Sequence, residues 1–479
     1  MMKALDKEIL RLAVPSILAN ITVPLVGLVD TAVAGHLHSV AGSSAEFIGG
    51  ISVGAMILSV IYWNFAFLRA STGGLTAQAY GRMAPSECHS ILRRAVSLSF
   101  AISVLLLALQ WPISRLALIF RDATPGVAAL AIRYVMIRIW AAPATLSLMS
   151  FKGWFIGMQD TVSSMFTDLI VNVVNIAASI ILTLGIGSWQ GMGFPGIALG
   201  TVIAQYSGLI FAFCVCRFKY RMSPKKSTMP CAGVVSGEGN AVPNVPATSD
   251  GPLPARPASG IADFFHLNTD LFVRSLCFTG IYLGYTIIAS RYGETLLACA
   301  NIMMNLLMIF SYFTDGFAYA GEALTGRFIG AKDGAMLRRS VAGTFRWSMG
   351  VAGIWMFIYA LAGLPMLRLM SDDPAVTDSC MQFIPWLIAM PPIGCAAFTW
   401  DGIYIGATAS KAMRNAMTWA LAAFLGVWFA GRALAPELFA ATPYNPAAIH
   451  LLMAAYFAHL AARTVHLSIR YRAEVLSRL

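Results

Sequence analysis

The sequence predicts an all-α membrane protein of about twelve transmembrane helices, arranged as two parallel-repeat lobes of about six helices each. Composition is the first reason, because 58% of the residues are hydrophobic, only 11% are charged and the mean hydropathy is +0.70. A water-soluble domain carries about 25% charged residues. The second reason is that almost charge-free runs of roughly 20 residues, each long enough to cross a bilayer, recur along the chain. The third is a repeated pair of motifs that divides the chain into halves.

Hydropathy places the expected spans along the chain in order. They lie near 12–35, 47–69, 92–119, 126–151, 163–186, 195–216, 266–289, 296–320, 341–367, 378–407, 413–434 and 447–467. The segment between the sixth and seventh spans is rich in Pro, Gly, Ser and Ala and predicts a flexible linker. We therefore expect an N-lobe over 1–222, a cytoplasmic linker over 223–262 and a C-lobe over 263–479.

The basic residues behind the net charge of +11 are distributed along the chain as expected for a membrane protein. Most Lys and Arg residues fall at the termini and in every second loop. The positive-inside rule then puts both termini and the linker in the cytoplasm, in a bacterial-type inner membrane. Short basic clusters between apolar runs argue against a nucleic-acid partner. The eight scattered cysteines predict neither a disulfide framework nor a metal site.

Two motifs recur in one register. Residues 75–81 align with 324–330 at a shift of 249 residues, and 153–157 align with 402–406 at the same shift. Two matches about eighty residues apart in a single register indicate a duplicated six-helix unit. Since six is an even number, both copies enter the membrane in the same direction, and a substrate path between the two lobes is expected.

Several motifs resemble those of a known family. Residues 29–31, 74–81 and 153–160 in the first half are similar to the multidrug and toxic compound extrusion (MATE) transporters. Residues 315–319, 322–326, 400–402 and 413–415 in the second half resemble the DinF-type branch of that family. This resemblance implies a V-shaped antiporter that exports organic, often cationic compounds in exchange for protons or sodium ions.

Asp30 is the leading candidate for binding the coupling cation. It lies in the outer half of the first span, and span geometry brings Asn172, Asn175 and Thr201 to a similar depth. A carboxylate inside the membrane needs a partner, water or a function. The resemblance supports Asp30, Asn175 and Thr201 as the cation-handling set. Relatives often carry Asn-x-x-Asn-x-x-x-Asp in the fifth span, whereas this run ends in Ser179, which favours protons over sodium.

Three acids of the second half, Asp315, Glu322 and Asp401, form a possible gate or second site near the cytoplasmic side. We expect Arg327 and Arg414 to pair with them because they lie at a similar depth. Substrate-cavity candidates are aromatic and methionine residues near the expected cleft, with ordinary packing or lipid contact as the alternative for each. These candidates are Tyr62, Trp63, Tyr282, Tyr285 and Met304.

The predicted function is cation-coupled, preferably proton-coupled, export of small organic compounds by alternating access. The sequence has no GxxxxGK[ST] loop, so an ion gradient is the expected energy source. We expect a monomer that is not an enzyme and uses no cofactor beyond H+ or Na+. The alternative is a flippase for lipid-linked precursors, which Arg133, Arg138 and Arg274 keep open. A membrane enzyme would need clustered histidines or paired carboxylates, which the sequence does not show.

Overall fold

The computed structural model describes residues 2–35, 43–120, 125–220, 261–371, 373–440 and 445–479. The first half forms α1 (Met2–Gly35), α2 (Ser44–Asn64), α3 (Phe67–Gly81), α4 (Pro85–Ala108), α5 (Gln110–Arg115), α6 (Pro125–Arg138), α7 (Ala142–Gly157), α8 (Thr161–Leu184) and α9 (Phe194–Phe218). The second half forms α10 (Ile261–Ala289), α11 (Glu294–Gly330), α12 (Gly334–Met370), α13 (Pro374–Met381), α14 (Ile384–Gly406), α15 (Ser410–Leu434) and α16 (Pro446–Glu474). Short 3-10 turns, η1 (Leu116–Phe120), η2 (Ile139–Ala141), η3 (Ser290–Tyr292) and η4 (Leu476–Arg478), adjoin these helices.

The prediction of an all-α membrane protein is confirmed. In the described residues, 11 helices are long and apolar enough to cross a bilayer, and the count reaches 12 with α13 and α14, which meet at a bend of 58°. Some helices run well beyond the predicted spans. The helix α11 continues for ten residues past position 320 and has 37 residues, about 55 Å at 1.5 Å per residue. Hydropathy marks only the part of a helix that lies in hydrocarbon, so it misses such extensions.

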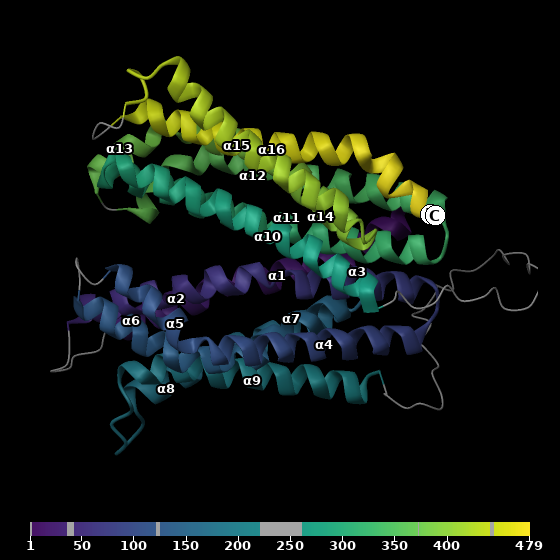
Figure 1. Ribbon diagram of the computed structural model, residues 1–479, viewed down its shortest axis with the longest axis horizontal. Helices are drawn as coiled ribbons and strands as arrows, with labels where there is room; N and C mark the ends of the chain where they lie inside the picture. The colour runs from purple at the N-terminus through teal and green to yellow at the C-terminus, as the bar shows by residue number, and fades with distance from the viewer. Residues whose placement is uncertain (1, 36–42, 121–124, 221–260, 372, 441–444) are drawn as a thin grey trace, which may run out of the picture.

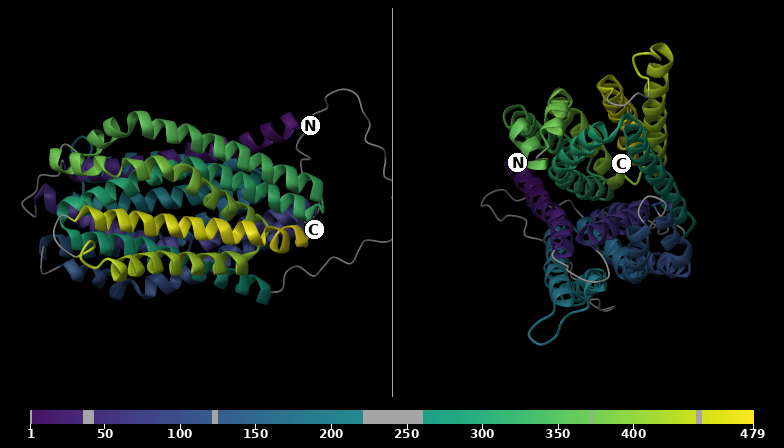
Figure 2. Two further views of the ribbon diagram at one scale, coloured as in Figure 1. Left: turned by 90° about the horizontal axis from the view of Figure 1, so that it is seen from above. Right: turned by 90° about the vertical axis from the view of Figure 1, so that its left-hand side faces the viewer.

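Helices α1 to α9 form one lobe and α10 to α16 form the other, stacked one above the other in the view of Figure 1. We call them the N-lobe and the C-lobe. Both chain ends and the two ends that flank residues 221–260 lie at the same end of the molecule (Figures 1 and 2). Most of the predicted linker, 223–262, lies outside the described residues. The end that carries the termini is called the terminal end.

The backbone repeats with the shift found in the sequence. Met83 and Lys332 both have positive φ, 58° and 55°, and so do Gln159 and Thr408, 62° and 54°. Each pair is separated by 249 residues. Positive φ is uncommon for residues other than glycine, so its recurrence at equivalent positions confirms that the halves are two copies of one unit.

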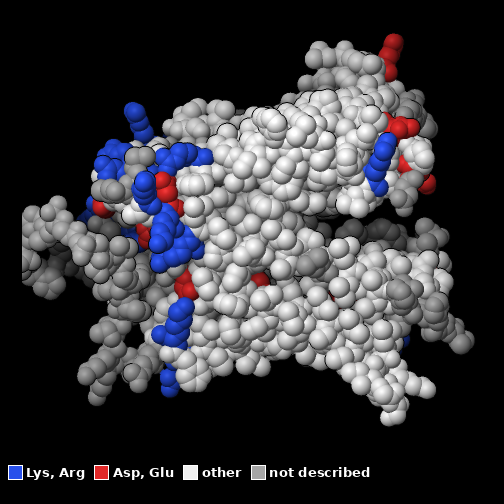
Figure 3. All heavy atoms as spheres, turned by 180° about the vertical axis from the view of Figure 1, so that it is seen from behind, with Lys and Arg blue, Asp and Glu red and all other residues white. Residues whose placement is uncertain are grey.

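The two lobes touch closely at the terminal end through equivalent glycines. A Cβ atom on Gly81 would come within 2.0 Å of the Arg327 carbonyl oxygen, and one on Gly330 within 2.1 Å of the Gln78 carbonyl oxygen. These two contacts exchange under the 249-residue shift, so they lie on either side of a pseudo-twofold axis. At the opposite end the lobes separate, and the space-filling view shows a notch between them (Figure 3).

Candidate functional site

A stripe of polar residues on α8 is buried inside the N-lobe. Asn175, Ser179 and Thr183 recur every four residues and therefore share one face of the helix. This face packs against α9, where Gly200 leaves so little room that a Cβ atom there would lie 2.7 Å from the Ser179 Oγ. Close helix packing at a small residue thus brings polar side chains of α8 and α9 together.

Asp30 of α1 lies beside this stripe. Its side chain is buried, with 6% exposed, and its carboxylate neighbours Ser179. The Asp30 Oδ1 atom has no hydrogen-bond partner among the described residues. An ionised carboxylate in this position is costly to keep inside a membrane unless a proton, a cation or water meets it.

The predicted companions of Asp30 divide into two groups. Asn175 donates from Nδ2 to Thr201 Oγ1 at 2.9 Å, and both side chains are buried next to the Asp30 region. Asn172 donates instead to Thr22 Oγ1 at 2.5 Å, and Thr22 precedes Asp30 by about two turns of α1. The structure therefore brings Asn175 and Thr201 together and places Asn172 further toward the terminal end.

An arginine and two tyrosines complete the pocket from α2 and α6. Arg138 donates from Nη1 to the Tyr134 hydroxyl at 3.0 Å, and its guanidinium lies 5.6 Å from the centre of that ring. Arg138 is also close enough to Asp30 and Tyr62 to interact with them electrostatically. From the sequence, Arg138 was expected to matter only in the flippase alternative. A charged residue in the middle of an apolar run is the sequence signal that could have placed Arg138 beside Asp30.

The pocket contains several buried polar atoms without partners. In the part of the chain that the structure describes, these are Asp30 Oδ1, Tyr62 OH, Asn175 Oδ1, Ser179 Oγ and Thr183 Oγ1. Buried polar groups in native proteins are nearly always hydrogen-bonded to protein, water or an ion. This concentration of unpaired atoms therefore indicates a pocket that can accept water, a proton or a small cation.

The acids of the C-lobe are neutralised in a different way. Asp401 receives both Arg274 and Arg463, the second at 2.8 Å, so two arginines share one carboxylate. Glu322, which is fully buried, pairs with Arg69 of the N-lobe at 2.9 Å. Asp315 lies within electrostatic range of Arg69, Arg274 and Arg463, and no ion pair is formed by it among the described residues.

The predicted pairing of these acids with Arg327 and Arg414 is wrong. Arg327 pairs with Glu8 of α1 at 2.5 Å, and Arg414 pairs with Asp270 of α10 at 2.7 Å. Membrane depth alone gave the wrong partners because it ignores which way each side chain points around its helix.

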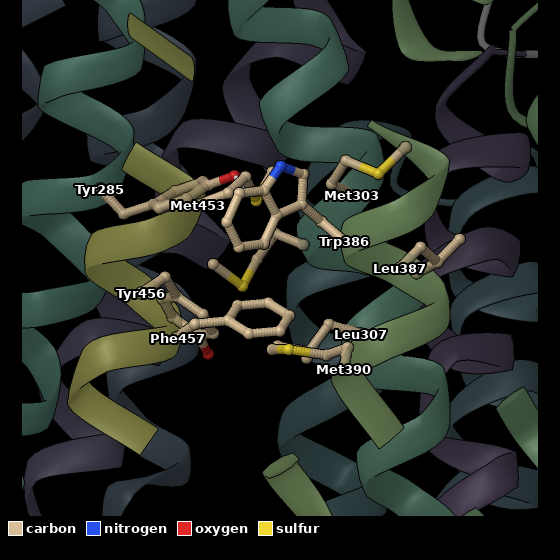
Figure 4. A pocket seen from close by; sticks show the side chains of 10 residues that line it. Tyr285, Met303, Leu307, Trp386, Leu387, Met390, Met453, Tyr456 and Phe457 are labelled. Atoms are coloured by element: carbon tan, nitrogen blue, oxygen red, sulfur yellow. Dashed lines mark hydrogen bonds between the residues drawn. The ribbon is translucent and has the colours of Figure 1, made fainter. Parts of the chain in front are cut away.

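The aromatic and methionine candidates occupy three different places. Trp63 and Tyr282 come from opposite lobes and pack edge to face with ring centres 5.2 Å apart. Tyr62 faces the Asp30 pocket, as its interaction with Arg138 indicates. Tyr285 and Met304 line a cavity inside the C-lobe (Figure 4). These residues therefore do not form one continuous cavity wall.

Comparison with known proteins identifies the family to which this sequence is similar. A family model called MatE matches residues 15–181 and 271–430 of the chain. The protein named "DNA damage-inducible protein F" from Escherichia coli (strain K12) is 33% identical over 88% of this chain and 84% of its own length. A "Probable multidrug resistance protein NorM" from Caulobacter vibrioides is 25% identical over 79% of this chain and 76% of its own.

Solved structures share the fold at low sequence identity. A multidrug resistance MATE family transporter in an outward-facing conformation has a TM-score of 0.78 and 15% identity, covering 99% of this chain and 96% of that one. A MATE structure in a bent conformation also has a TM-score of 0.78, at 14% identity, and covers 100% of this chain and 98% of that one.

Proposed function

The chain belongs to the MatE family of multidrug efflux transporters, and on that premise we propose that it is a proton-coupled antiporter exporting small organic compounds by alternating access. Membership makes it a multi-pass membrane transporter of small molecules. The coupling ion, the class of exported compound and the orientation in the membrane belong to our proposal.

The buried carboxylate of Asp30 carries this proposal. Its Oδ1 atom has no partner among the described residues, and the neighbouring side chains Ser179, Asn175 and Thr201 are neutral. One carboxylate faced by the positive charge of Arg138 gives the pocket no net negative charge with which to hold a sodium ion. A proton needs only the carboxylate itself, so this arrangement favours proton coupling.

The helix α1 offers a connection between Asp30 and the movement of the lobes. Its first turns bind the C-lobe, because Glu8 pairs with Arg327 of α11 and Asp6 pairs with Arg346 of α12. Its later turns carry Asp30 in the N-lobe, and Pro15 and Pro24 lie between. Proline removes a helical hydrogen bond and permits bending. Loading Asp30 with a proton can therefore change how α1 spans the two lobes.

The charge distribution supports an orientation with the terminal end in the cytoplasm. Lys and Arg residues gather at the end from which the termini and the flanks of 221–260 emerge (Figure 3). The positive-inside rule then places this end in the cytoplasm of a bacterial inner membrane. In that orientation the structure is closed on the inside and open on the outside. We also propose that the transporter works as a monomer with a proton as its only coupling ion.

Reconstituted vesicles test the proposal. A proton gradient and a sodium gradient are imposed separately while efflux of a fluorescent organic cation is followed. We expect the proton gradient alone to drive efflux, and Asp30→Asn to abolish it. The matched control is Asp378→Asn, the same chemical change at an exposed position of α13, which should transport as the wild type does.

Two results would overturn the proposal. One is efflux driven by sodium alone, and the other is undiminished proton-driven efflux by the Asp30→Asn variant. The alternative prediction of a flippase for lipid-linked precursors gains no support from the comparisons, which point to the multidrug efflux family.

A further inference from the structure

Two cysteines of the C-lobe, Cys299 and Cys380, lie at the end of the molecule opposite to the terminal end. The helix α11 runs from Glu294 at that end to Gly330 at the terminal end, and α13 also lies there (Figure 1). At 1.5 Å per residue, Cys299 is about 8 Å from the start of α11 and Cys380 about 9 Å from the start of α13. The two residues are therefore at a similar depth.

The two side chains meet between α11 and α13. The Cys299 Sγ atom donates to the Val376 carbonyl at 3.5 Å. Val376 precedes Cys380 by one turn of α13, so both are on the same face of that helix. The thiols of Cys299 and Cys380 are close enough to hydrogen-bond with each other. Both residues are 0% exposed, so the pair is enclosed by the packing of the two helices.

Burial by itself does not bring thiols together, as Cys395 of the same lobe shows. Its side chain is equally buried, but its Sγ atom lies 2.8 Å from Ser348 Oγ and 3.9 Å from Thr399 Oγ1. Its neighbours are thus hydroxyl groups of α12 and α14. Cys395 therefore provides a matched control for the pair.

The location of the pair determines its redox environment. In the orientation proposed above, the terminal end lies in the cytoplasm, so Cys299 and Cys380 lie near the outer face of the membrane. Disulfides form and persist outside the bacterial cytoplasm, whereas cytoplasmic thiols are kept reduced. This step rests on the proposed function, but only through the orientation.

We propose that Cys299 and Cys380 form a disulfide bond that fastens α13 to α11. The oxidant is a protein disulfide. One cysteine thiolate attacks it and forms a mixed disulfide, and the second thiolate then attacks the sulfur of the first cysteine. A new S–S bond forms as the oxidant leaves as a dithiol with two electrons and two protons. Since both thiols are buried in the folded lobe, the exchange takes place before α13 packs.

The bond would hold a segment that cannot hold itself. The helix α13 has only 8 residues, and isolated helices shorter than about 12–15 residues are marginal in water. It meets α14 at a bend of 58°, so it is not a straight extension of its neighbour. A disulfide between Cys299 and Cys380 would close a long loop, which restricts the unfolded chain, and would keep the outer end of this bent span on α11.

Counting of free thiols tests the proposal. Cells that express the full-length protein are precipitated with acid to stop thiol exchange. The protein is then denatured and reacted with a polyethylene glycol maleimide, which adds a fixed mass per free thiol. The sequence has eight cysteines, so we expect six adducts without reductant and eight after reduction. Mass spectrometry of non-reduced peptides should show Cys299 linked to Cys380. Eight adducts without reductant would overturn the proposal.

Variants identify the bonded pair. Cys299→Ser and Cys380→Ser should each give seven adducts with and without reductant. The control Cys395→Ser should keep the difference, with five adducts before reduction and seven after it. The count is made on denatured protein, so a variant that folds poorly still gives a reading. A reductant-dependent difference that persists in Cys299→Ser would assign the bond to other cysteines and refute the inference.

Thermal unfolding tests whether the bond fastens α13. Reductant should lower the Tm of the purified wild-type protein by roughly 5 °C, because loss of the cross-link frees the unfolded chain. The same reductant should leave the Tm of Cys299→Ser unchanged. An unchanged Tm in the reduced wild type would contradict a fastening role for the bond.

Failure of this inference can be told apart from failure of the proposed function. Thiol counting needs no gradient, so eight free thiols would reject the disulfide and leave proton-driven efflux untouched. The Asp30→Asn variant should keep the bond. Orientation is checked with Ser477→Cys, an exposed position at the terminal end, which an impermeant maleimide should label only in permeabilised cells. Labelling above the wild-type level in intact cells would overturn the inference through its premise.

Discussion

Arg69 of the N-lobe donates from Nη1 to the fully buried carboxylate of Glu322 in the C-lobe at 2.9 Å. The guanidinium also lies 4.5 Å from the centre of the Tyr319 ring. Glu322 occupies the position that Gly73 holds in the first repeat, and a Cβ atom on Gly73 would lie only 1.9 Å from Glu322 Oε1. The pseudo-twofold axis therefore passes between a glycine and a glutamate, and the smaller residue makes room for the ion pair that joins the lobes.

Replacing Arg69 by Met should destabilise the closed terminal end. The change leaves the Glu322 carboxylate buried without its partner, and breaking a buried ion pair in this way costs about 3–5 kcal/mol. We expect a lowered Tm in thermal unfolding and faster thiol labelling of a cysteine placed at Gln78, which bonds the opposite lobe at the Gly406 carbonyl.

The matched control is Arg82→Met. Arg82 pairs with Glu87 at 2.8 Å, but both side chains are partly exposed, and such pairs contribute only about 0–1 kcal/mol. An equal fall in Tm for the two variants would show that the interlobe ion pair stabilises the protein no more than an exposed ion pair does.

Gly74→Ala should hinder close contact between the lobes at the terminal end. A Cβ atom at this position would lie 2.1 Å from the Ile405 carbonyl oxygen of the other lobe, and backbone cannot move away cheaply. We expect destabilisation of roughly 1–3 kcal/mol and slower transport in vesicles.

Gly27→Ala on α1 is the control, for which we expect a change in Tm of the opposite sign. No atom lies within 4 Å of the added methyl group there. Alanine favours a helix over glycine by up to about 1 kcal/mol, so this variant should match or exceed the wild type in Tm. Equal losses of stability in both variants would contradict an effect specific to the interlobe contact, since helix propensity predicts a gain at each position.

Thr201→Val should damage the Asp30 pocket while keeping the shape of the side chain. The change removes the oxygen that accepts the Asn175 Nδ2 hydrogen bond at 2.9 Å. Leaving that buried donor unpaired costs about 1–3 kcal/mol. Proton-driven efflux should fall, since Asn175 borders the proposed proton site.

Ser207→Ala on the same helix is the control. Its hydroxyl bonds only the backbone of its own helix, at the Ile203 carbonyl, so little change is expected in Tm or efflux. Full activity of Thr201→Val would remove Thr201 from the cation-handling set.

Asp160 should make stability depend on pH. It caps α8 and receives Lys219 at 2.7 Å and Tyr220 at 2.6 Å. Burial opposes ionisation, but the hydrogen bonds from Lys219, Ser163 and Tyr220 outweigh it and lower the pKa of Asp160 below 3.8. Because the pKa is lower in the folded state, its stabilising effect is complete above about pH 4 and is lost as pH falls through the folded value.

Tm measured from pH 7 to pH 3 checks this expectation. Asp160→Asn keeps an oxygen for capping but loses the charge, so its Tm should be lower than that of the wild type at pH 7. The difference should shrink below pH 4. Asp333→Asn, at the start of α12, controls for changing a capping carboxylate as such. A constant difference between Asp160→Asn and wild type across this range would contradict the linkage.

The positions of the helices and the internal repeat of 249 residues could be predicted from the sequence. Apolar runs locate spans because only a helix satisfies its own backbone inside a bilayer. The shift of 249 residues predicted equivalent halves, and the paired φ angles of Met83 and Lys332 confirm it. The polar residues Asp30, Asn175 and Thr201 were found for the same reason, since polar atoms are rare in such runs.

Only the tertiary structure decided how the polar groups combine. Depth in the membrane is only one coordinate, and it suggested Arg327 and Arg414 as partners of the C-lobe acids, whereas these two arginines pair with Glu8 and Asp270. Pairing depends also on the rotation of each helix and on which helices are neighbours, which hydropathy does not encode. The small cavity in the C-lobe could not be predicted from the sequence either, because its wall comes from four helices whose facing sides meet only in the folded chain.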